Sequence, residues 1–259
     1  MHPTQLLVTA IILTKNEEAN IAEAINSVIW ADEILVVDSF STDNTLELAR
    51  QFPVKILQRP FDNHARQKNW AFTQASHCWI LILDADERIP EALATEIKSI
   101  LAAGPDKAAY WIFRENYFMG QQVKYSNWQH DKVIRLFDKE QGRYSDRAVH
   151  EEIETTGPVG YLKHKIIHYT YRNLGHYLEK YICYSWWSAQ DRAKKTKKVT
   201  LYHLALKPLF RFFRQYILKL GFLDGKVGFI IASMSAYSVF LRYLIAWRLK
   251  NGEKIPEGL

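Results

Sequence analysis

The feature of the sequence that most constrains its fold is a regular alternation of short apolar runs and helical patterns in the first hundred residues. The apolar runs are Leu6–Leu13, Glu33–Val37, Val54–Leu57 and Trp79–Leu83. The segments with helical spacing are Glu17–Val28, Thr45–Gln51, His64–Ala75 and the stretch from Pro90 to about Ala102. This order is typical of βαβ units, in which helices cover both faces of a mostly parallel sheet. We therefore predict an α/β fold.

The pattern changes after Ala108. Ala109–Phe118 and Val133–Phe137 have the composition of strands and no long helix separates them, which predicts a mixed extension of the same sheet. After Tyr169 the sequence becomes helical, beginning with the aromatic-rich segment Leu174–Lys194. We therefore expect a sheet-containing domain at residues 1–170 and a helical C-terminal extension at residues 171–259.

The two predicted regions differ strongly in charge. Residues 1–159 contain 16 Lys and Arg against 23 Asp and Glu, a net charge of −7, whereas residues 160–259 contain 18 against 5, a net charge of +13. An acidic region joined to a strongly basic one indicates that the two meet different partners. The composition, with 48% hydrophobic and 24% charged residues, excludes a disordered chain.

Two segments of the basic region have the composition of membrane-associated helices. In Lys207–Leu220, helical periodicity separates basic from large apolar residues, which is typical of an interfacial helix on an anionic membrane. The basic stripe contains Lys207, Arg211 and Arg214, and the apolar side contains Leu209, Phe212, Phe213, Tyr216 and Leu220. Val227–Leu241 is apolar but is interrupted by Arg242, and it falls short of the ~20 residues that span a bilayer. The alternative for both segments is a basic helical hairpin packed on the first domain.

An acidic cluster follows the fourth apolar run. In WILILDADERIP, residues 79–90, the strand runs directly into Asp84, Asp86 and Glu87. Grouped carboxylates repel one another and are costly to bury without a cation, so we expect a positive partner here. Residues two apart in an extended segment point the same way, so Asp84 and Asp86 can face one ion. Hard oxygen ligands of this kind suit Mg²⁺ or Mn²⁺, which also bind phosphates.

Polar residues follow the first two apolar runs as well. Thr14, Asn16 and Glu17 lie after the first run, and Asp38 ends the second. In open parallel sheets ligands bind outside the carboxyl ends of the strands, so these residues are candidate ligand contacts. The Asp38 carboxylate can accept hydrogen bonds from a ribose or a base. The alternative role for all four is to cap the loop or helix that follows.

Several cationic residues are candidates for binding phosphate. Arg66, Lys68 and Asn69 begin a helix that leads toward the Asp84 strand, where a cation can neutralise a diphosphate. Arg114 and Arg135 lie in the strand-rich stretch, and each can hold a phosphate or an acidic acceptor. Solvated surface charge is the alternative for these residues.

Two histidines complete the set of candidate site residues. His150 stands beside Glu151, and such a pair can supply a metal ligand and a general base. Both are needed when a hydroxyl attacks a carbon that bears a phosphate leaving group, although the pair can also be ordinary exposed charge. His168 follows two apolar residues and is either a core histidine or a weaker metal-ligand candidate.

Taken in order, these stretches resemble a known family. VTAIILTKNEEANIAEAINSV, ILVVDSFSTDNTLELA, ARQKNWAFTQA and WILILDADE are similar to the inverting family 2 glycosyltransferases, which have the Rossmann-like GT-A fold. The later VIRLFDKEQGRYSDRAVHEEI and FRQYILKLGFLDGKVGF resemble the lipopolysaccharide-core β-glucosyltransferase branch, the WaaE or KdtX type. The sequence lacks the Glu-Asp and Gln-x-x-Arg-Trp motifs of processive members, so processive polymerisation is not implied. SFSTDNT also departs from the commoner DGSTDGT.

The resemblance implies a metal-dependent hexosyltransferase with a nucleotide-diphosphate-sugar donor, UDP-glucose. It implies that Asp84 and Asp86 hold Mg²⁺ or Mn²⁺, and that Glu151, with His150, removes a proton from the acceptor hydroxyl. It assigns the nucleotide-sugar contacts to Thr14, Asn16, Glu17, Asp38, Arg66, Asn69 and Asp84. The implied acceptor is a lipid-linked saccharide, such as lipopolysaccharide core or another cell-envelope glycan.

The expected location is the cytoplasm, with peripheral association to the inner face of the cytoplasmic membrane. Cys78 and Cys183 lie far apart without metal-ligand spacing, which favours a reducing compartment. Two rival functions are a transferase that uses a polyprenyl-phosphate acceptor, which needs no protein base, and a nucleic-acid-binding module built on the basic region. The Phe and Leu residues among the basic ones favour a lipid surface over nucleic acid.

Overall fold

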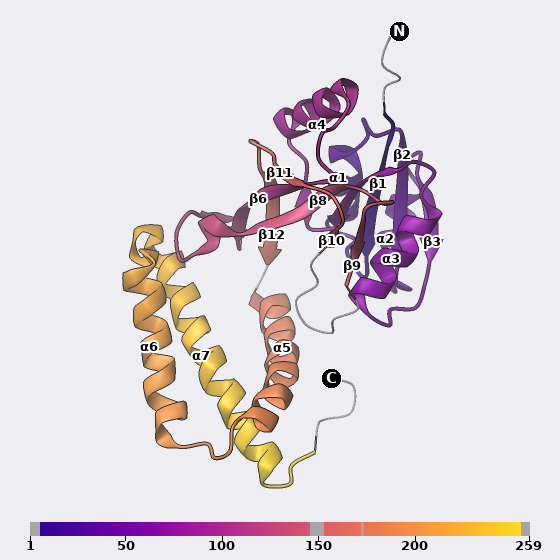
Figure 1. Ribbon diagram of the computed structural model, residues 1–259. Coiled ribbons are helices and arrows are strands. Elements are labelled where there is room, and N and C mark those ends of the chain that lie inside the picture. Colours follow the sequence, from indigo (N-terminus) through magenta and orange to yellow (C-terminus); the bar gives the residue numbers. More distant parts are fainter. Residues whose placement is uncertain (1–5, 146–152, 172–173, 255–259) are drawn as a thin grey trace. The chain divides into compact units, whose positions relative to one another are not determined.

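The computed structural model describes residues 6–145, 153–171 and 174–254 (Figure 1). The chain forms two compact units. The first, called the sheet unit, comprises Met1–Glu115 and Asp131–His168, and the second, called the helical unit, comprises Asn116–His130 and Tyr169–Leu259. Cys78 carries a free thiol, and the side chain of Cys183 lies outside the described part of the chain.

The sheet unit is built on four parallel strands. In spatial order they are β3 (Lys55–Gln58), β2 (Glu33–Asp38), β1 (Val8–Thr14) and β4 (Trp79–Asp84). β8 (Lys132–Asp138) pairs antiparallel with β4, and β6 (Ala109–Phe118) pairs antiparallel with β8. These strands confirm the predicted mostly parallel sheet and its mixed extension.

Shorter strands complete the sheets. β11 (Val159–Tyr161) pairs parallel with β6, and β12 (Ile166–Tyr171) pairs antiparallel with β5 (Glu87–Arg88). β9 (Gly142–Tyr144) and β10 (Ile153–Thr155) form a separate antiparallel pair. In the helical unit, β7 (Gln121–Val123) pairs with the end of β6.

Helices cover both faces of the sheet. They are α1 (Ile21–Ser27), α2 (Thr45–Ala49), α3 (His64–Gln74) and α4 (Glu91–Ala103). Successive residues of a strand point to opposite faces, so in β1 the side chain of Ile12 joins the apolar cluster with α1, α2 and α4, and that of Ile11 joins the cluster with α3. Burial of both faces explains why the strands read as continuous apolar runs.

The register of the parallel strands brings their polar carboxyl ends together. Thr14 at the end of β1 lies opposite Asp38 at the end of β2, and Leu13 lies opposite Asp84 at the end of β4. The three candidate residues predicted at separate strand ends therefore share one edge of the sheet, where ligands bind in folds of this class.

Among the described residues, the helical unit contains two long helices, α5 (Leu174–Lys195) and α7 (Gly225–Lys250), and the short α6 (Lys207–Phe213); α7 packs against both α5 and α6 (Figure 1). Short turns flank α6 and precede α7: η2 (Tyr202–Leu206), η3 (Arg214–Leu218) and η4 (Gly221–Asp224). A further turn, η1 (Trp128–His130), lies in the segment that precedes β8. Aromatic rings fill the helix interfaces: Tyr181 stacks on Tyr237 at 6.0 Å between centroids, and Phe212 meets Phe229 at 5.7 Å.

The expected length of the last apolar helix is wrong. The sequence suggested an apolar segment ending before Arg242, but α7 continues through this residue to Lys250. Arg242 is accommodated because its guanidinium donates to Ser238 Oγ, one turn earlier, at 3.4 Å. Among the described residues, Gly221–Lys250 is the one helical segment that is long and apolar enough to cross a membrane by length and composition.

The predicted division of Lys207–Leu220 into two faces is only partly confirmed. Leu209 and Phe213 are exposed, as expected. Tyr216, on the same predicted face, instead packs against Phe229 of α7, and Lys207 donates to Tyr243 Oη at 2.8 Å rather than facing water alone. The apolar surface of α7 is covered by part of Lys207–Leu220. The apolar residues of this segment are therefore divided between a face that packs on α7 and a face that is exposed.

Candidate functional site

Asp38 lies at the carboxyl end of β2, next to Thr14 of β1, and is fully buried. Its carboxylate accepts hydrogen bonds from the Ser41 backbone N–H at 3.0 Å and from Gln58 Nε2 at 3.0 Å. These bonds hold the loop after β2 against the sheet. Phe40 occupies the left-handed region in this loop, with φ of 57°, and its ring is exposed. Asp38 therefore fixes the conformation of the SFSTDNT loop, which stands in place of the commoner DGSTDGT.

The loop after β1 is tied to the segment after β2 by hydrogen bonds to the Asn16 and Thr45 side chains. Asn16, with φ of 55°, accepts from the Thr42 backbone N–H at Oδ1 at 2.8 Å. The Glu17 backbone N–H donates to Thr45 Oγ1 at 2.8 Å. Thr14 Oγ1 is buried and has no hydrogen-bond partner among the described residues. Asn16 and the Glu17 backbone thus brace the two loops, while the Thr14 hydroxyl retains its hydrogen-bonding capacity.

The partners of the acidic cluster are two arginines from the later strands. Arg135 of β8 forms an ion pair with Asp84 and donates from Nη2 to Glu87 Oε1 at 2.8 Å. Arg114 of β6 places Nε 2.9 Å from the same Glu87 oxygen. The Asp84 backbone N–H also donates to Glu87 Oε2 at 3.2 Å. Arg114 and Arg135, predicted as phosphate or acceptor contacts, therefore surround the carboxylates directly.

These charges determine the ionisation of the cluster. Burial alone raises the pKa of Asp84, but the charges of Arg135, Lys68 and Arg114 outweigh it and hold the pKa well below its ordinary value. Burial likewise opposes ionisation of Glu87, and the two arginines lower its pKa. Both carboxylates are therefore charged at neutral pH and available as ligands or hydrogen-bond acceptors.

Asp86 lies in the turn between β4 and β5, next to His168 of β12. Asp86 Oδ1 is 3.7 Å from His168 Nε2, and burial lowers the pKa of His168 to about 4. The imidazole is therefore neutral at pH 7, the form that binds metals. The weaker metal-ligand candidate of the sequence lies beside the predicted metal-binding pair.

The carboxylates of this site fit a divalent cation that is bound partly by the protein and partly by a substrate. Within the described ranges no group of three or more His, Cys, Asp or Glu side chains is arranged to hold a metal. Asp84 and Asp86 offer two hard carboxylate ligands, and Mg²⁺ is commonly bound by one or two carboxylates with water and substrate phosphates filling its other positions. The residues therefore fit a cation that arrives with a diphosphate.

A cavity of about 360 Å³ opens beside Asp84. Its volume lies within the range of about 300–1,000 Å³ that holds small-molecule ligands. Four cations line it, namely Lys68, Arg114, Lys132 and Arg135. The aromatic residues Trp111 and Tyr144 also line it, and the Lys132 ammonium lies 4.7 Å from the centroid of the Trp111 ring. A space with several cations, two aromatic rings and one carboxylate suits a phosphorylated sugar.

Sequence reasoning did not find Lys132, Trp111 or Tyr144 as site residues. They lie on β8, β6 and β9. β8 pairs with β4, β6 pairs with β8, and β9, which belongs to a separate sheet, is held by Asn69 of α3. Tyr144 lies in the stretch VIRLFDKEQGRYSDRAVHEEI, which carried the resemblance but assigned this residue no role. Glu87 was noticed as part of the acidic cluster, but its role as the buried partner of two arginines depends on the same strands.

Of the predicted nucleotide-sugar contacts, Asp84 lines this cavity, and Thr14, Asn16, Glu17, Asp38, Arg66 and Asn69 do not. Asn69 on α3 uses its whole amide to hold the Tyr144 backbone, with Nδ2 donating to the carbonyl at 2.9 Å and Oδ1 accepting from the N–H at 2.9 Å. Arg66, in the first turn of α3, is exposed. Asn63 caps this turn by accepting from the Ala65 and Arg66 backbone N–H groups. His150 and Glu151 lie outside the described residues.

Comparison with known proteins places this site in a family. The sequence model of glycosyl transferase family 2 matches residues 9–161, which contain the parallel strands and the acidic cluster. The uncharacterized glycosyltransferase RT0209 of Rickettsia typhi is 30% identical over 247 residues, covering 91% of this chain and 85% of that protein. The lipopolysaccharide core biosynthesis glycosyltransferase LpsC of Rhizobium meliloti is 28% identical over 258 residues, covering 94% of this chain and 96% of that protein.

Among solved structures, a crystal structure of glucosyl-3-phosphoglycerate synthase from Mycobacterium tuberculosis with Mn²⁺, UDP and phosphoglyceric acid overlaps in part. It is 20% identical, has a TM-score of 0.36, and the overlap covers 44% of each chain. An overlap of this extent assigns no ligand to the present protein. The family model spans more than half of the chain, and relatives such as RT0209 are similar over most of it. The protein therefore belongs to glycosyl transferase family 2.

Proposed function

We propose that the protein transfers a hexose, with inversion, from UDP-glucose to a lipid-linked saccharide acceptor such as lipopolysaccharide core or another cell-envelope glycan. The observation that carries the proposal is the cation-lined cavity beside Asp84 in a family 2 glycosyltransferase. A UDP leaving group brings two negatively charged phosphates, and Lys68, Arg114 and Arg135 around this cavity provide the opposite charge.

Asp84 and Asp86 are the residues that would hold Mg²⁺ or Mn²⁺. Asp84 is ionised, and Asp86 lies beside the neutral imidazole of His168 at the edge of the sheet. The cation, when bound, supplies Lewis-acid stabilisation of the departing diphosphate. Arg135 can remain with Glu87 when Asp84 turns to a cation, because Glu87 is already its second partner. Glu87 thereby keeps a guanidinium close to the diphosphate.

The chemical step needs one proton acceptor. A bond forms between the acceptor hydroxyl oxygen and the anomeric carbon, the bond from that carbon to the UDP oxygen breaks, and its electron pair stays with UDP. We assign removal of the hydroxyl proton to Glu151, assisted by His150, from the resemblance of the HE pair to that of the branch. Thr14, Asn16, Glu17 and Asp38 are our candidates for the nucleotide side of the site.

The relative LpsC and the helical unit support our proposal for the acceptor and the location. The name of the relative LpsC refers to lipopolysaccharide core biosynthesis, and its similarity covers both units of this chain. Many large apolar side chains of the helical unit are exposed, as on proteins that contact lipid. We therefore propose that residues 171–259 attach the enzyme to the cytoplasmic face of the membrane, where a lipid-linked acceptor is presented.

One observation favours the rival acceptor, a polyprenyl phosphate. The helix α7 is long and apolar enough to cross a membrane, where such a lipid is found. The two reactions differ in their need for a base. An acceptor hydroxyl must lose a proton, whereas a phosphate acceptor is already ionised. Glu151→Gln should therefore slow UDP release with the saccharide acceptor by about 10²–10⁴-fold. The neighbouring Glu152→Gln is the matched control, and unchanged turnover in both variants would favour the phosphate acceptor.

The donor is tested by calorimetry on the intact protein with UDP and UDP-glucose, each with and without Mn²⁺. We expect binding that requires the metal, is lost in Asp86→Ala and is retained in Asp106→Ala, a surface carboxylate paired with Lys107. UDP-galactose and GDP-mannose in the same experiment determine which sugar and which base are selected. Absence of binding for both UDP and UDP-glucose under every condition would refute the UDP-sugar proposal.

A further inference from the structure

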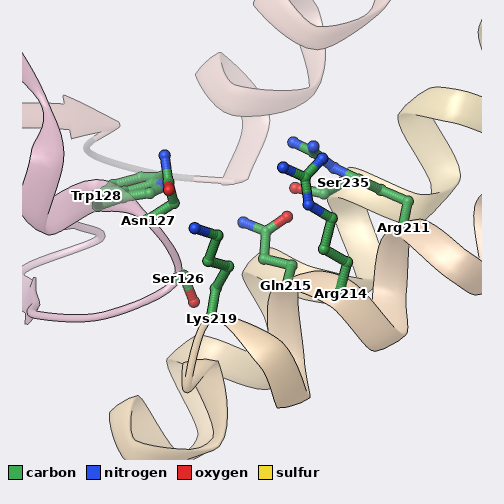
Figure 2. A pocket seen from close by; sticks show the side chains of 8 residues that line it. All are labelled: Ser126, Asn127, Trp128, Arg211, Arg214, Gln215, Lys219 and Ser235. Atoms are coloured by element: carbon green, nitrogen blue, oxygen red, sulfur yellow. The ribbon is translucent and has the colours of Figure 1, made fainter.

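A second cavity, of about 220 Å³, lies within the helical unit (Figure 2). It is smaller than the range of about 300–1,000 Å³ that holds whole small-molecule ligands, so it suits a single chemical group. Three cations line it, Arg211 at the end of α6, Arg214 in η3 and Lys219 just after η3. Figure 2 shows Arg214, Gln215 and Lys219 extending from the helix toward the same space.

The cations of this cavity have no carboxylate partner among the described residues. Within the part of the chain that the structure describes, no carboxylate pairs with Arg211, Arg214 or Lys219, and none lines the cavity. Burial and the neighbouring charge of Arg214 together lower the pKa of Arg211, because the two positive guanidiniums repel each other. Like charges held together in this way are stabilised by a bound anion.

Two buried polar side chains provide a second, independent sign of a ligand. Gln215 is only 6% exposed and Ser126 only 2%, and both line the cavity. Gln215 Oε1 and Ser126 Oγ have no hydrogen-bond partner among the described residues. A buried polar atom left without a partner costs about 1–3 kcal/mol. The Ser126 hydroxyl can donate to an anion, and the Gln215 amide can do so when it turns to present Nε2 in place of Oε1.

The walls of the cavity are fixed by hydrogen bonds within the helical unit. The loop that carries Ser126 is held by Asp224, whose carboxylate accepts from the Lys124 and Tyr125 backbone N–H groups at 2.9 and 3.0 Å. The Ser126 N–H donates to the Lys219 carbonyl at 2.9 Å. On the opposite wall, η3 is a π-helical turn, a geometry found often at functional sites. The cations are therefore placed by a fixed frame.

The surroundings identify the kind of anion. Exposed apolar side chains lie on the same helical segment as Arg211 and Arg214: Leu209, Phe210, Phe213, Ile217 and Leu218. A free phosphate in water gains nothing from such neighbours, whereas a lipid places its phosphate next to acyl chains. Arginine pairs well with phosphate because its planar fork makes two parallel hydrogen bonds.

We propose that the cavity formed by Arg211, Arg214, Gln215 and Lys219 binds the phosphate group of a membrane lipid. The site fixes the position of the helical unit on the bilayer, beyond the general attraction of a basic surface to anionic lipid. It deepens the proposed function, since it rests on membrane attachment of residues 171–259, but it does not depend on the donor or on the chemical step.

The test is calorimetry of the full chain with dihexanoylphosphatidic acid, a soluble lipid with an exposed phosphate, and with inorganic phosphate. We expect the lipid to bind and inorganic phosphate to bind much more weakly. In R211Q/R214Q, loss of two charge-assisted hydrogen bonds should weaken lipid binding by at least about tenfold. K197Q/K198Q removes the same charge from two exposed residues of the same unit and should bind lipid as the unaltered protein does.

Four outcomes would overturn the proposal. These are no lipid binding, equal binding of lipid and inorganic phosphate, equal losses in both double variants, or full lipid binding by R211Q/R214Q. Melting curves and UDP binding measured on each variant separate this site from the donor site. Lipid binding by a protein that does not bind UDP would leave this inference standing and refute the UDP-sugar donor.

Discussion

Arg135 donates from Nη2 to Oε1 of Glu87 at 2.8 Å, and the two side chains are only 4% and 0% exposed. A buried ion pair of this kind is strongly destabilising when one partner is removed, because the other charge is left in a medium that cannot solvate it. The pair joins β8 to the segment that follows β4, so it connects the antiparallel extension of the sheet to the acidic cluster. The stability of the site therefore depends on it.

We predict that Arg135→Met destabilises the protein by about 3–5 kcal/mol, measured as the shift of the urea unfolding transition. Arg135→Met with Glu87→Leu should recover part of the loss, because the carboxylate that has lost Arg135 is removed too, while Arg114 keeps its pairing with Asp131. Lys107→Met, which breaks the surface pair with Asp106, is the control and should cost about 0–1 kcal/mol. An unchanged transition in Arg135→Met would show that the pair contributes nothing to stability.

Asn69 and Arg66 should separate by role, although both were assigned as nucleotide contacts. Asn69→Ala removes both hydrogen bonds to the Tyr144 backbone, and we expect a loss of about 1–3 kcal/mol in stability. Arg66→Ala changes an exposed residue, so its stability should stay within about 0.5 kcal/mol while UDP binding weakens. Urea unfolding and UDP calorimetry on both variants test this. Normal stability with lost UDP binding in Asn69→Ala would instead indicate a direct contact.

Gly228 in α7 should not tolerate a methyl group. A Cβ at this position would lie 1.7 Å from the Gly221 carbonyl oxygen, so the turn that precedes α7 would have to move. Alanine has the higher helix propensity by about 1 kcal/mol, but we expect the clash to dominate and Gly228→Ala to lose about 1–3 kcal/mol. Thermal unfolding measures the effect, with Ser233→Ala on the same helix as a control. A raised melting temperature in Gly228→Ala would contradict the close packing.

The pairing of Glu96 predicts a pH-dependent stability. Burial raises the pKa of Glu96, but hydrogen bonds from the Lys163 and His164 backbone N–H groups at 2.8 and 3.0 Å, and from the His164 ring, outweigh it and hold the pKa below 4.5. A carboxyl with a depressed folded pKa stabilises the fold above its unfolded pKa, and this stability is lost as the pH falls through the folded pKa.

Glu96→Ala should therefore lower the melting temperature at pH 7, through a loss of about 1–2 kcal/mol, and the difference from the unaltered protein should shrink below pH 4.5. Glu91→Ala on the same helix serves as the control and should have a smaller effect at pH 7. A difference that is the same at pH 7 and pH 3 would mean that the Glu96 charge is not involved.

Much of the sheet unit was predictable from the sequence because its signals are local. β6 has the bounds expected, Ala109–Phe118, and β1, β2 and β4 differ from the predicted runs by one or two residues at their ends. Strands buried on both faces must be apolar throughout, and polar residues can appear only where they end. The positions of Thr14, Asp38 and Asp84 at one edge followed from this rule and from the parallel arrangement.

The sequence by itself determined the parallel strands and the helices of the first hundred residues, where the acidic cluster lies and that this cluster needs a positive partner. Only the tertiary structure decided that Arg114 and Arg135 supply the charge, that α7 continues through Arg242, and that Arg211, Arg214 and Lys219 share one cavity. The physical reason is the range of the interactions. A periodic pattern of burial can be read from residues that are neighbours in the sequence. The partner of a charge is instead set by the register of strands and the packing of helices that are distant in the chain.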